Sequence, residues 1–350
     1  MSSDERNQKF YPANRPNIIV TGGAGFIGSH LCESLIQNNN VICIDSLIAS
    51  ENYKNLETLL QSPNFYFIKH DINQPIDLLS FPELQNLKIK FQGIQEIYHL
   101  ACPTSAKNFD QFKVDTLKAN SLGMVNILEL AMQYQAKVLF TSSSVVYGRR
   151  QSGQSSLKEI DLGQVDFTGG RACYDEGKRF AETICFTYRQ KYNLDVKVAR
   201  IFRTYGPRLA LFDGQMVADF VLQAINNKPM IIYGDANFDT SLCYVSDIVE
   251  GILALMGSKE NGPINLGHPQ KYFLVDVAKK IIDATSSSSS VEYREPLVFM
   301  SPLGLPDISL AKEKLSWFPV VTIDDGLRRT IEYIKAHRLL FQPLVAKYEE

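Results

Sequence analysis

Short apolar runs alternate with longer amphipathic stretches over residues 16–206. An apolar run of about four to eight residues predicts a buried strand, and apolar residues spaced three and four apart predict a helix. The predicted strands are Asn17–Thr21, Val41–Asp45, Phe65–His70, Ile94–Cys102, Lys137–Ser142 and Asp195–Ile201. The predicted helices include Phe26–Gln37, Asp115–Tyr134 and Tyr174–Gln190. This alternation predicts an α/β fold, a doubly wound parallel sheet of the Rossmann type, whose ligands bind at the carboxyl ends of the strands.

The pattern becomes irregular after Pro207, where short helices, brief strands and prolines follow one another. We expect residues 207–241 and 269–350 to form a smaller C-terminal α/β lobe that binds the substrate. Residues 242–268 are expected to pack back onto the nucleotide-binding domain of residues 16–206, because Val245–Met256 has the pattern of a core-packed helix. Residues 1–15 form a polar N-terminal tail. Polar composition predicts exposed loops at Gln151–Thr168 and Ser286–Ser290.

The charge and the cysteine pattern argue against several classes of protein. Among 350 residues, 36 basic and 38 acidic side chains give a net charge of −2, so no basic surface indicates nucleic-acid binding. No apolar run approaches the ~20 residues that span a bilayer, and the polar first residues do not resemble a signal peptide. The six scattered cysteines form no C-x-x-C pair, and no histidine spacing indicates a metal site. The protein is therefore expected to be cytoplasmic, with no metal, no membrane and no nucleic acid as partner.

A glycine-rich segment, GGAGFIG at residues 22–28, separates the first predicted strand from the first predicted helix. Its spacing G-x-x-G-x-x-G allows a tight turn, approach of the backbone to a pyrophosphate, and close packing of helix on strand. Asp45 ends the next strand, where a carboxylate would accept hydrogen bonds from the adenosine ribose and repel a 2′-phosphate. The alternative is a structural turn beside an ordinary aspartate. The context favours NAD over NADP, held by Gly22, Gly25, Phe26, Ile27, Gly28 and Asp45.

A tyrosine and a lysine four residues apart, Tyr174 and Lys178, lie in the predicted helix of RACYDEGKRFAET. Residues at i and i+4 share a helix face, and a cation beside a phenol of pKa about 10 should lower that pKa. Such a tyrosine could act as a base toward a sugar hydroxyl. Ser143 lies in the serine cluster that closes the fifth strand. Its hydroxyl could share a hydrogen bond with the substrate hydroxyl and Tyr174. Taken alone, each pattern has a simpler interpretation. The tyrosine and the lysine could be two surface residues of an amphipathic helix, and the serines could form an ordinary turn.

With these residues assembled, the chain resembles the extended short-chain dehydrogenase/reductase family of nucleotide-sugar enzymes. The resemblance covers about residues 17–334 and includes TGGAGFIGSHL, YHLAC, SSVVYG, YDEGK, ARIFRTYGP, YVSDIVEGI and INLG. Within that family it is most similar to UDP-glucuronate decarboxylases, through RACYDEGKRFAET and PDISLAKEKLSWFPVVTIDDGL. The resemblance implies bound NAD, a UDP-sugar or other nucleotide-sugar substrate, and a catalytic Ser143/Tyr174/Lys178 triad. It implies further cofactor contacts at Asp71, Ile72, Leu100, Ala101, Thr116, Ser142, Tyr174, Lys178 and Thr204, and substrate contacts at Asn120, Ser144, Arg171, Arg203 and Arg208.

Three positions depart from the decarboxylase pattern. Val145 stands where these enzymes have a glutamate, Arg203 where they have an asparagine, and Thr240 where they have an arginine tied to the nucleotide phosphates. The triad that would oxidise the sugar is intact. The glutamate and the arginine, which these enzymes use in the decarboxylation half of the reaction, are missing. Arg203 could return the lost positive charge from another strand, since a guanidinium binds phosphate or carboxylate in a fork. Neutral change in a tolerant pocket wall is the other interpretation.

Three functions therefore remain in competition. The leading prediction is decarboxylation of UDP-glucuronate to UDP-xylose through a 4-keto intermediate. A nucleotide-sugar 4-epimerase needs the same triad and commonly has a small or uncharged residue at the position of Val145. A non-catalytic sugar-nucleotide binder is the third, although the intact triad argues against it.

The resemblance also implies a homodimer held by a four-helix interface. The predicted helices Asp115–Tyr134 and Tyr174–Gln190 carry apolar residues beyond one face. The residues expected to contribute are Leu122, Met124, Ile127, Phe180 and Phe186.

Overall fold

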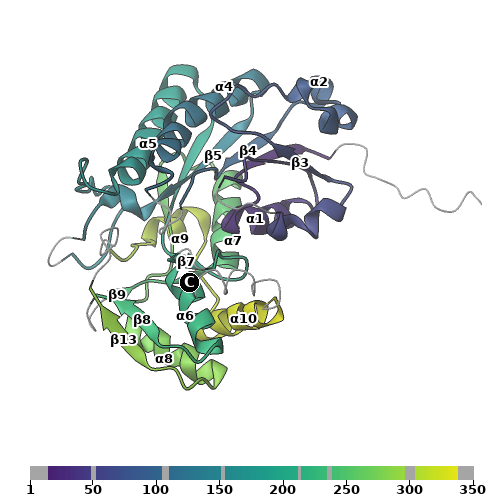
Figure 1. Ribbon diagram of the computed structural model, residues 1–350. Coiled ribbons are helices and arrows are strands. Elements are labelled where there is room, and N and C mark those ends of the chain that lie inside the picture. The colour runs from purple at the N-terminus through teal and green to yellow at the C-terminus, as the bar shows by residue number, and fades with distance from the viewer. Residues whose placement is uncertain are drawn as a thin grey trace, which may run out of the picture.

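Seven parallel strands form the central sheet of the molecule, in the order β11-β6-β5-β4-β1-β2-β3 (Figure 1). The computed structural model describes residues 15–48, 53–104, 110–150, 154–211, 214–234, 239–295 and 304–337. The sheet strands are β1 (Asn17–Thr21), β2 (Asn40–Asp45), β3 (Phe65–Lys69), β4 (Glu96–His99), β5 (Lys137–Ser143), β6 (Val196–Ile201) and β11 (Pro263–Leu266). The predicted doubly wound parallel sheet is confirmed.

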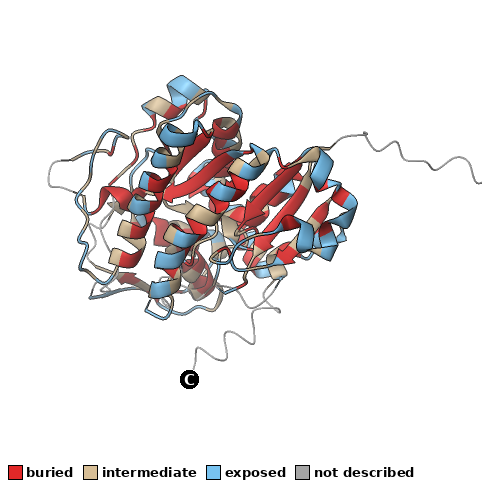
Figure 2. Ribbon diagram, turned by 90° about the horizontal axis from the view of Figure 1, so that it is seen from above, coloured by how far each residue is buried: buried red, intermediate tan, exposed pale blue. Residues whose placement is uncertain are grey.

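Helices cover both faces of this sheet, so its strands are buried on both sides (Figure 2). Helices α1 (Phe26–Leu35) and α7 (Val245–Gly257) pack on one face, and α4 (Met124–Tyr134) and α5 (Ala172–Tyr192) pack on the other. Successive strand side chains point to opposite faces. Accordingly Ile18 and Val20 join the core under α1 and α7, whereas Ile19 joins the core under α4 and α5. This two-sided burial explains why the strands are continuous apolar runs.

The helix predicted over Asp115–Tyr134 is interrupted. It consists of α3 (Lys113–Lys118), a π-helical turn η5 (Ala119–Gly123) and α4. A π-helical turn inserts one residue per turn into an α-helix and occurs often at functional sites. Here α5 crosses the turn closely, since a Cβ added at Gly177 would lie 3.2 Å from Asn120 Nδ2. The sequence period does not reveal the turn, because apolar residues on both sides keep helical spacing.

Segments after Pro207 divide between the sheet and a smaller lobe. Helix α7 and strand β11 belong to the central layers, and β7 (Thr204–Tyr205) pairs with β10 (Cys243–Tyr244). In the lobe, β8 (Met230–Tyr233) pairs with β13 (Val291–Arg294), and β9 (Asp239–Thr240) with β12 (Tyr272–Phe273). The lobe helices are α6 (Met216–Ile225), α8 (Leu274–Thr285) and α10 (Ile323–Ala336). The remaining short helices are α2 (Ile89–Gln92), α9 (Ser309–Leu315), and 3-10 turns at Lys54–Leu56, Leu59–Gln61, Leu78–Ser80, Pro82–Leu87 and Ser144–Tyr147.

Both segments predicted as exposed loops are partly fixed by the rest of the molecule. In the described part of the first loop, Leu157 is buried, its N–H donates to Leu305 O at 2.8 Å, and its carbonyl accepts from Asp307 N at 2.9 Å. In the second, the Ser287 hydroxyl donates to Ala224 O at 2.8 Å. Polar composition predicted the absence of regular structure there but not these contacts. No helix among the described residues has the length and apolarity needed to cross a membrane.

Candidate active site

A cavity of about 1160 Å³ opens at the carboxyl ends of the sheet strands. Its wall includes residues that follow β1, β2, β3 and β4, the end of β5, and the segment after β6. Pockets for one drug-sized ligand are about 300–1,000 Å³. The cavity is therefore larger than the usual pocket for one small ligand.

The glycine loop forms one end of the cavity. Gly22 has φ +73°, and an added Cβ would lie 2.7 Å from Ala101 N. At Gly28 an added Cβ would lie 2.1 Å from Gly22 O, so α1 can approach the loop only because this residue has no side chain. Gly25, Phe26 and Ile27 place the first turn of α1 against the cavity. A helix N-terminus exposed to the cavity behind a glycine turn fits the pyrophosphate of a dinucleotide.

Asp45 ends β2 beside this loop and lines the same cavity. Its Oδ2 accepts from Ala24 N at 3.0 Å, and its Oδ1 accepts from Leu47 N at 2.9 Å. Burial raises the pKa of this carboxyl, and the two backbone N–H groups oppose the rise. The two bonds fix the carboxylate next to the turn, where it can accept ribose hydroxyls and would repel a 2′-phosphate.

Most of the other predicted cofactor and substrate contacts lie in the cavity wall. The wall includes Asp71, Ile72, Leu100, Ala101, Ser142, Ser144, Arg171, Arg203, Thr204 and Arg208. Arg208 has φ +68° and pairs its Nη2 with Glu33 Oε2 of α1 at 2.7 Å, which places its charge beside α1. The described wall residues do not include Thr116 and Asn120, which are buried behind Cys102 and Pro103.

The predicted catalytic residues meet where β5 ends against α5. The Ser143 side chain lies beside the Tyr174 hydroxyl and acts to lower its pKa. Lys178 follows one helical turn later, with its Nζ 5.9 Å from the centre of the Tyr174 ring and 2.9 Å from Thr141 O, to which it donates. All three residues line the cavity. The structure therefore brings the predicted triad together.

The pKa of Tyr174 differs from the sequence expectation. Burial, followed by the nearby Cys102 thiol, raises the pKa of Tyr174, whereas the Ser143 side chain and the charge of Arg171 oppose the rise. The ammonium of Lys178 is directed to the Thr141 carbonyl, and burial lowers its own pKa. The expected lowering of the tyrosine pKa by Lys178 is therefore wrong.

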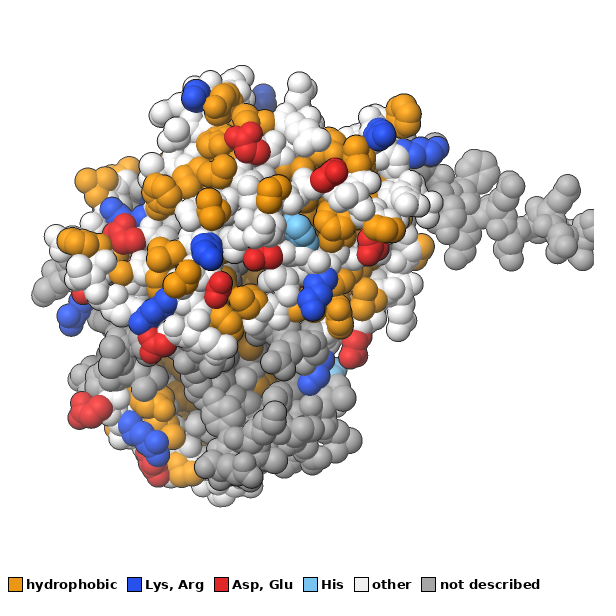
Figure 3. Space-filling model, turned by 45° about the horizontal axis from the view of Figure 1, so that its top comes forward, with side chains coloured by type: hydrophobic (Ala, Val, Ile, Leu, Met, Phe, Trp, Pro, Cys, Tyr) orange, Lys and Arg blue, Asp and Glu red, His pale blue; other side chains and the backbone are white. Residues whose placement is uncertain are grey.

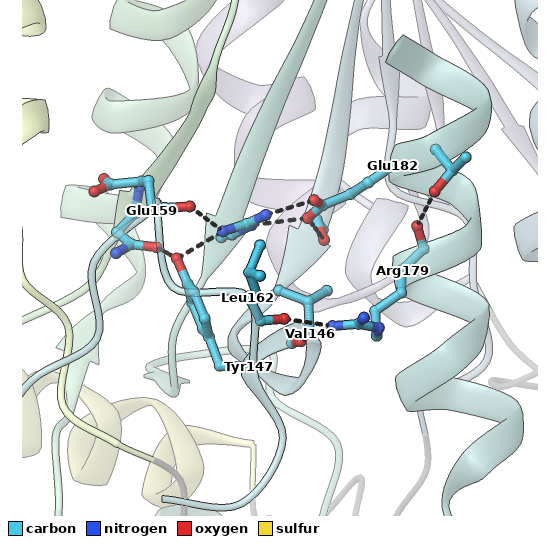
Figure 4. Close-up of polar contacts among 10 residues, drawn as sticks. Val146, Tyr147, Glu159, Leu162, Arg179 and Glu182 are labelled. Carbon is cyan, nitrogen blue, oxygen red and sulfur yellow. Dashed lines mark hydrogen bonds and ion pairs between the residues drawn. The ribbon is translucent and has the colours of Figure 1, made fainter. Parts of the chain in front are cut away.

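Ser142 has a different role from its neighbour Ser143. Its hydroxyl donates to Glu182 Oε1 at 2.6 Å, away from the cavity. Glu182 also accepts from Arg200 Nε at 3.0 Å and from Arg200 Nη2 at 2.8 Å (Figure 4). Arg200 Nη1 donates to Tyr147 Oη at 2.9 Å and to Glu159 O at 3.0 Å. Ser142 lines the cavity as predicted, but its hydroxyl proton is directed to this polar network.

The three positions that depart from the decarboxylase pattern lie in different surroundings. Val145 is buried directly after the serine cluster and supplies no charge. Arg203 follows β6 and lines the cavity. Thr240 is buried in β9, where its hydroxyl donates to Ser241 O at 3.2 Å.

Three further residues, Cys102, Tyr333 and His337, line the cavity although the motifs give them no role. Cys102 follows β4 directly, so the rule that ligands bind at strand ends could have indicated it. Tyr333 lies in α10, and its ring is tilted against that of His337 at a ring-centre distance of 4.2 Å. No local signal places this distant helix beside the nucleotide-binding domain.

Comparison with known proteins gives consistent results. The profile of the NAD dependent epimerase/dehydratase family matches residues 18–267. UDP-glucuronic acid decarboxylase 1 of Arabidopsis thaliana is 40% identical over 318 residues, which are 91% of this chain and 69% of that protein. UDP-glucuronic acid decarboxylase 6 of the same plant is 38% identical over 329 residues, 93% of this chain and 91% of that protein.

A solved structure shares the fold at lower identity. The UDP-glucuronic acid 4-epimerase of Bacillus cereus, in complex with UDP-glucuronic acid and NAD, superimposes with a TM-score of 0.78 at 26% identity. The match covers 91% of this chain and 99% of that one. The similarity therefore includes the central sheet and the smaller lobe.

Proposed function

Because the chain belongs to the NAD dependent epimerase/dehydratase family, we propose that it is an NAD-dependent enzyme that decarboxylates UDP-glucuronate to UDP-xylose. The observation that carries this proposal is the contact between Ser143 and Tyr174, with Lys178 one turn away, in a cavity shared with the glycine loop. The decarboxylase relatives extend over most of the chain. They support an enzyme over a non-catalytic binder.

The glycine loop, Asp45 and the wall residues after β3 and β4 would hold NAD. When bound, NAD accepts the hydride that leaves C4 of the sugar and later returns it. Tyr174 accepts the proton of the C4 hydroxyl, which Ser143 orients by sharing the hydrogen bond. Lys178 holds its charge near the tyrosine ring, within the same buried site.

The oxidised sugar then decarboxylates by its own chemistry. With a ketone at C4, the carboxylate on C5 belongs to a β-keto acid. The C5–C6 bond breaks, its electron pair passes toward the C4 oxygen, and CO2 leaves. C5 then takes up a proton, and reduction of the ketone, with the proton returned by Tyr174, completes a cycle without net redox change.

The second candidate is a 4-epimerase that retains the carboxylate. Two observations favour it: Val145 supplies no acid at its position, and solved epimerases of this family share the fold. Such an enzyme would use the same Tyr174 and Ser143 for oxidation. The ketone would turn over within the site before reduction on its other face.

Incubation of the purified protein with NAD and UDP-glucuronate, followed by mass spectrometry, tests these proposals. A product lighter by the mass of CO2 supports decarboxylation. A product of unchanged mass with a new retention time supports epimerisation instead. Unchanged substrate, with UDP-glucose and UDP-galactose also unconverted, would contradict both.

We further propose a homodimer through α3, η5 and α5, which lie side by side. Exposed apolar residues on these elements include Val114 (61% exposed), Leu122 (55%) and Phe180 (54%). Figure 3 shows apolar side chains among charged ones on the face that carries α4 and α5. Met124 and Ile127 are fully buried in the core, so the expectation that they contribute to the interface is wrong.

A further inference from the structure

Arg203 brings a positive charge into the cavity that no acidic side chain of the described residues balances. Its backbone is fixed, because Phe202 N donates to Leu266 O at 2.9 Å and Cys243 N donates to Arg203 O at 3.0 Å. Its side chain lines the cavity, and it makes no ion pair or side-chain hydrogen bond with another described residue. Burial and the charge of Arg171 lower the pKa of Arg203. A guanidinium in such surroundings is stabilised by an anion.

Arg171 supplies a second guanidinium to the same region. It precedes α5, three residues before Tyr174, and its Nη2 lies 3.2 Å from Asp175 Oδ1. It lines the same cavity as Arg203 and Tyr174, and its charge lowers the pKa of Arg203 and opposes the rise in the pKa of Tyr174. The acidic wall residues come from other segments, namely the end of β2, the segments after β2 and β3, and α3; they are Asp45, Glu57, Asp71 and Asp115.

We propose that Arg203 and Arg171 form a subsite for the carboxylate of an acidic sugar, an inference that rests on the proposed function. In a hexuronate the carboxylate is attached to C5, the neighbour of the C4 that Tyr174 would deprotonate. The diphosphate is attached to C1, on the opposite side of the ring. Because Arg171 lies near Tyr174, the guanidinium pair fits the carboxylate better than the diphosphate. The fork geometry of a guanidinium matches the two carboxylate oxygens.

The subsite would select among substrates more than it would accelerate the reaction. A guanidinium bound to the carboxylate stabilises the charge before the C5–C6 bond breaks. That charge moves away as CO2 forms, so the interaction is not stronger in the transition state. Loss of Arg203 should therefore raise KM far more than it lowers kcat.

Binding should be measured by calorimetry with NAD present in a Tyr174→Phe background, which prevents turnover. A charge-assisted hydrogen bond contributes about 1.5–3 kcal/mol, so Arg203→Asn should weaken UDP-glucuronate binding about ten- to a hundredfold. Affinity for UDP-glucose and UDP should stay within about twofold. Arg203→Lys should retain part of the preference, because it keeps the charge but loses the fork. The matched control Arg294→Asn, at an exposed arginine of β13, should change none of the affinities.

Equal losses for UDP-glucuronate, UDP-glucose and UDP would overturn the proposal, because they would place Arg203 at the diphosphate. No loss for UDP-glucuronate would overturn it as well. These outcomes are separate from a failure of the proposed function. CO2 release by the unmutated enzyme tests the reaction, whereas the Arg203 comparison tests which group of the substrate the arginine contacts.

Discussion

Tyr174 and Lys178 share one face of α5, but their polar ends have different partners. Tyr174 meets Ser143, and Lys178 donates to the carbonyl of Thr141 and lies 4.6 Å above the Phe140 ring. The pair is fixed by β5 on one side and by α5 on the other. Because burial raises the pKa of Tyr174, the phenol is in its neutral form near pH 7.

Tyr174→Phe tests the proposed base directly. The variant should lose turnover by at least about a hundredfold, because a positioned base contributes about 10²–10⁴-fold. NAD affinity should change little, since only the proton-transfer group is removed. Lys178→Ala should reduce both. Initial rates and NAD titrations measure the two effects, and residual activity within about tenfold of the unmutated enzyme would show that the base lies elsewhere.

His99 provides a test of stability against pH. It is buried at the end of β4, its Nδ1 lies 2.7 Å from Thr21 Oγ1, and its ring stacks on Phe140. Burial, with a smaller contribution from Lys178, lowers the pKa of His99 from 6.5 to about 3. Above pH 6.5 the histidine is neutral in both the folded and the unfolded protein. Below it, only the unfolded chain takes up the proton, so stability falls as the pH falls toward the folded pKa.

The variant His99→Gln lacks the group that takes up this proton on unfolding. We therefore expect its stability to depend less on pH. Between about pH 6 and pH 4, the unmutated protein should lose about 1.4 kcal/mol more per pH unit than the variant. Urea unfolding at several pH values measures the difference. Parallel stability curves for the two proteins would contradict the assignment.

The residue types that carry local chemistry could be predicted from the sequence, whereas side-chain direction could not. The spacing of Tyr174 and Lys178 and the strand-end position of Ser143 were sufficient to place the proposed triad. Ser142 follows the same pattern as Ser143, but strand alternation turns its hydroxyl to Glu182. The pKa of Tyr174 depends on burial, which a pair of residues at i and i+4 does not determine.

At the scale of elements, α5 connects the proposed catalytic site to a buried polar network. Glu182 lies two helical turns after Tyr174 and pairs with Arg200 of β6 through two hydrogen bonds. Arg200 contacts Tyr147, whose hydroxyl donates to Asn265 Oδ1 of β11 at 2.6 Å. The network therefore joins four elements: α5, β6, β11 and the turn that follows β5.

Glu182→Gln should destabilise the protein markedly, because it leaves Arg200, whose side chain is only 11% exposed, without its carboxylate. Removing one partner of a buried ion pair costs about 3–5 kcal/mol. Arg200→Gln should cost a similar amount, and the double variant should cost less than the sum. Chemical unfolding of the four proteins measures the coupling energy.

Arg328→Gln is the matched control for this cycle. Arg328 makes two ion pairs, to Asp325 and Glu332, but more than half of its side chain is exposed. Exposed pairs contribute about 0–1 kcal/mol. Two outcomes would contradict a coupled buried pair. One is a loss of unfolding free energy in the double variant that equals the sum of the two single losses, and the other is single losses no larger than that of Arg328→Gln.

Element types were predicted well where one period was sustained, and poorly where tertiary contacts decide. All six predicted sheet strands exist, because buried parallel strands are apolar on both faces. The π-helical turn at Ala119–Gly123 lies where α5 crosses closely, a contact that the local sequence does not reveal. Likewise, Leu157 is held by backbone bonds to residues far along the chain, which polar composition does not reveal.

At the scale of the whole molecule, assembly depends on apolar surface that the fold leaves uncovered. Helix α10 returns from the C-terminal lobe to the cavity wall through Tyr333, so both lobes contribute to one site within a single chain. The exposed apolar residues of α3, η5 and α5 lie on another part of the surface and contribute nothing to that wall. They are available to a second copy of the chain.

The homodimer proposal predicts that Phe180→Asp gives a monomer. A charge on the exposed face of α5 would have to be desolvated in the interface, at a cost of several kcal/mol. Phe91→Asp on α2, which lies apart from α5 (Figure 1), is the matched control, because Phe91 is 90% exposed and should leave the mass unchanged. Light scattering at micromolar concentration measures the mass of each protein. Both variants should keep their NAD affinity, since neither residue lines the described cavity. A monomeric unmutated protein, or a dimer that survives Phe180→Asp, would show that α5 is not the interface.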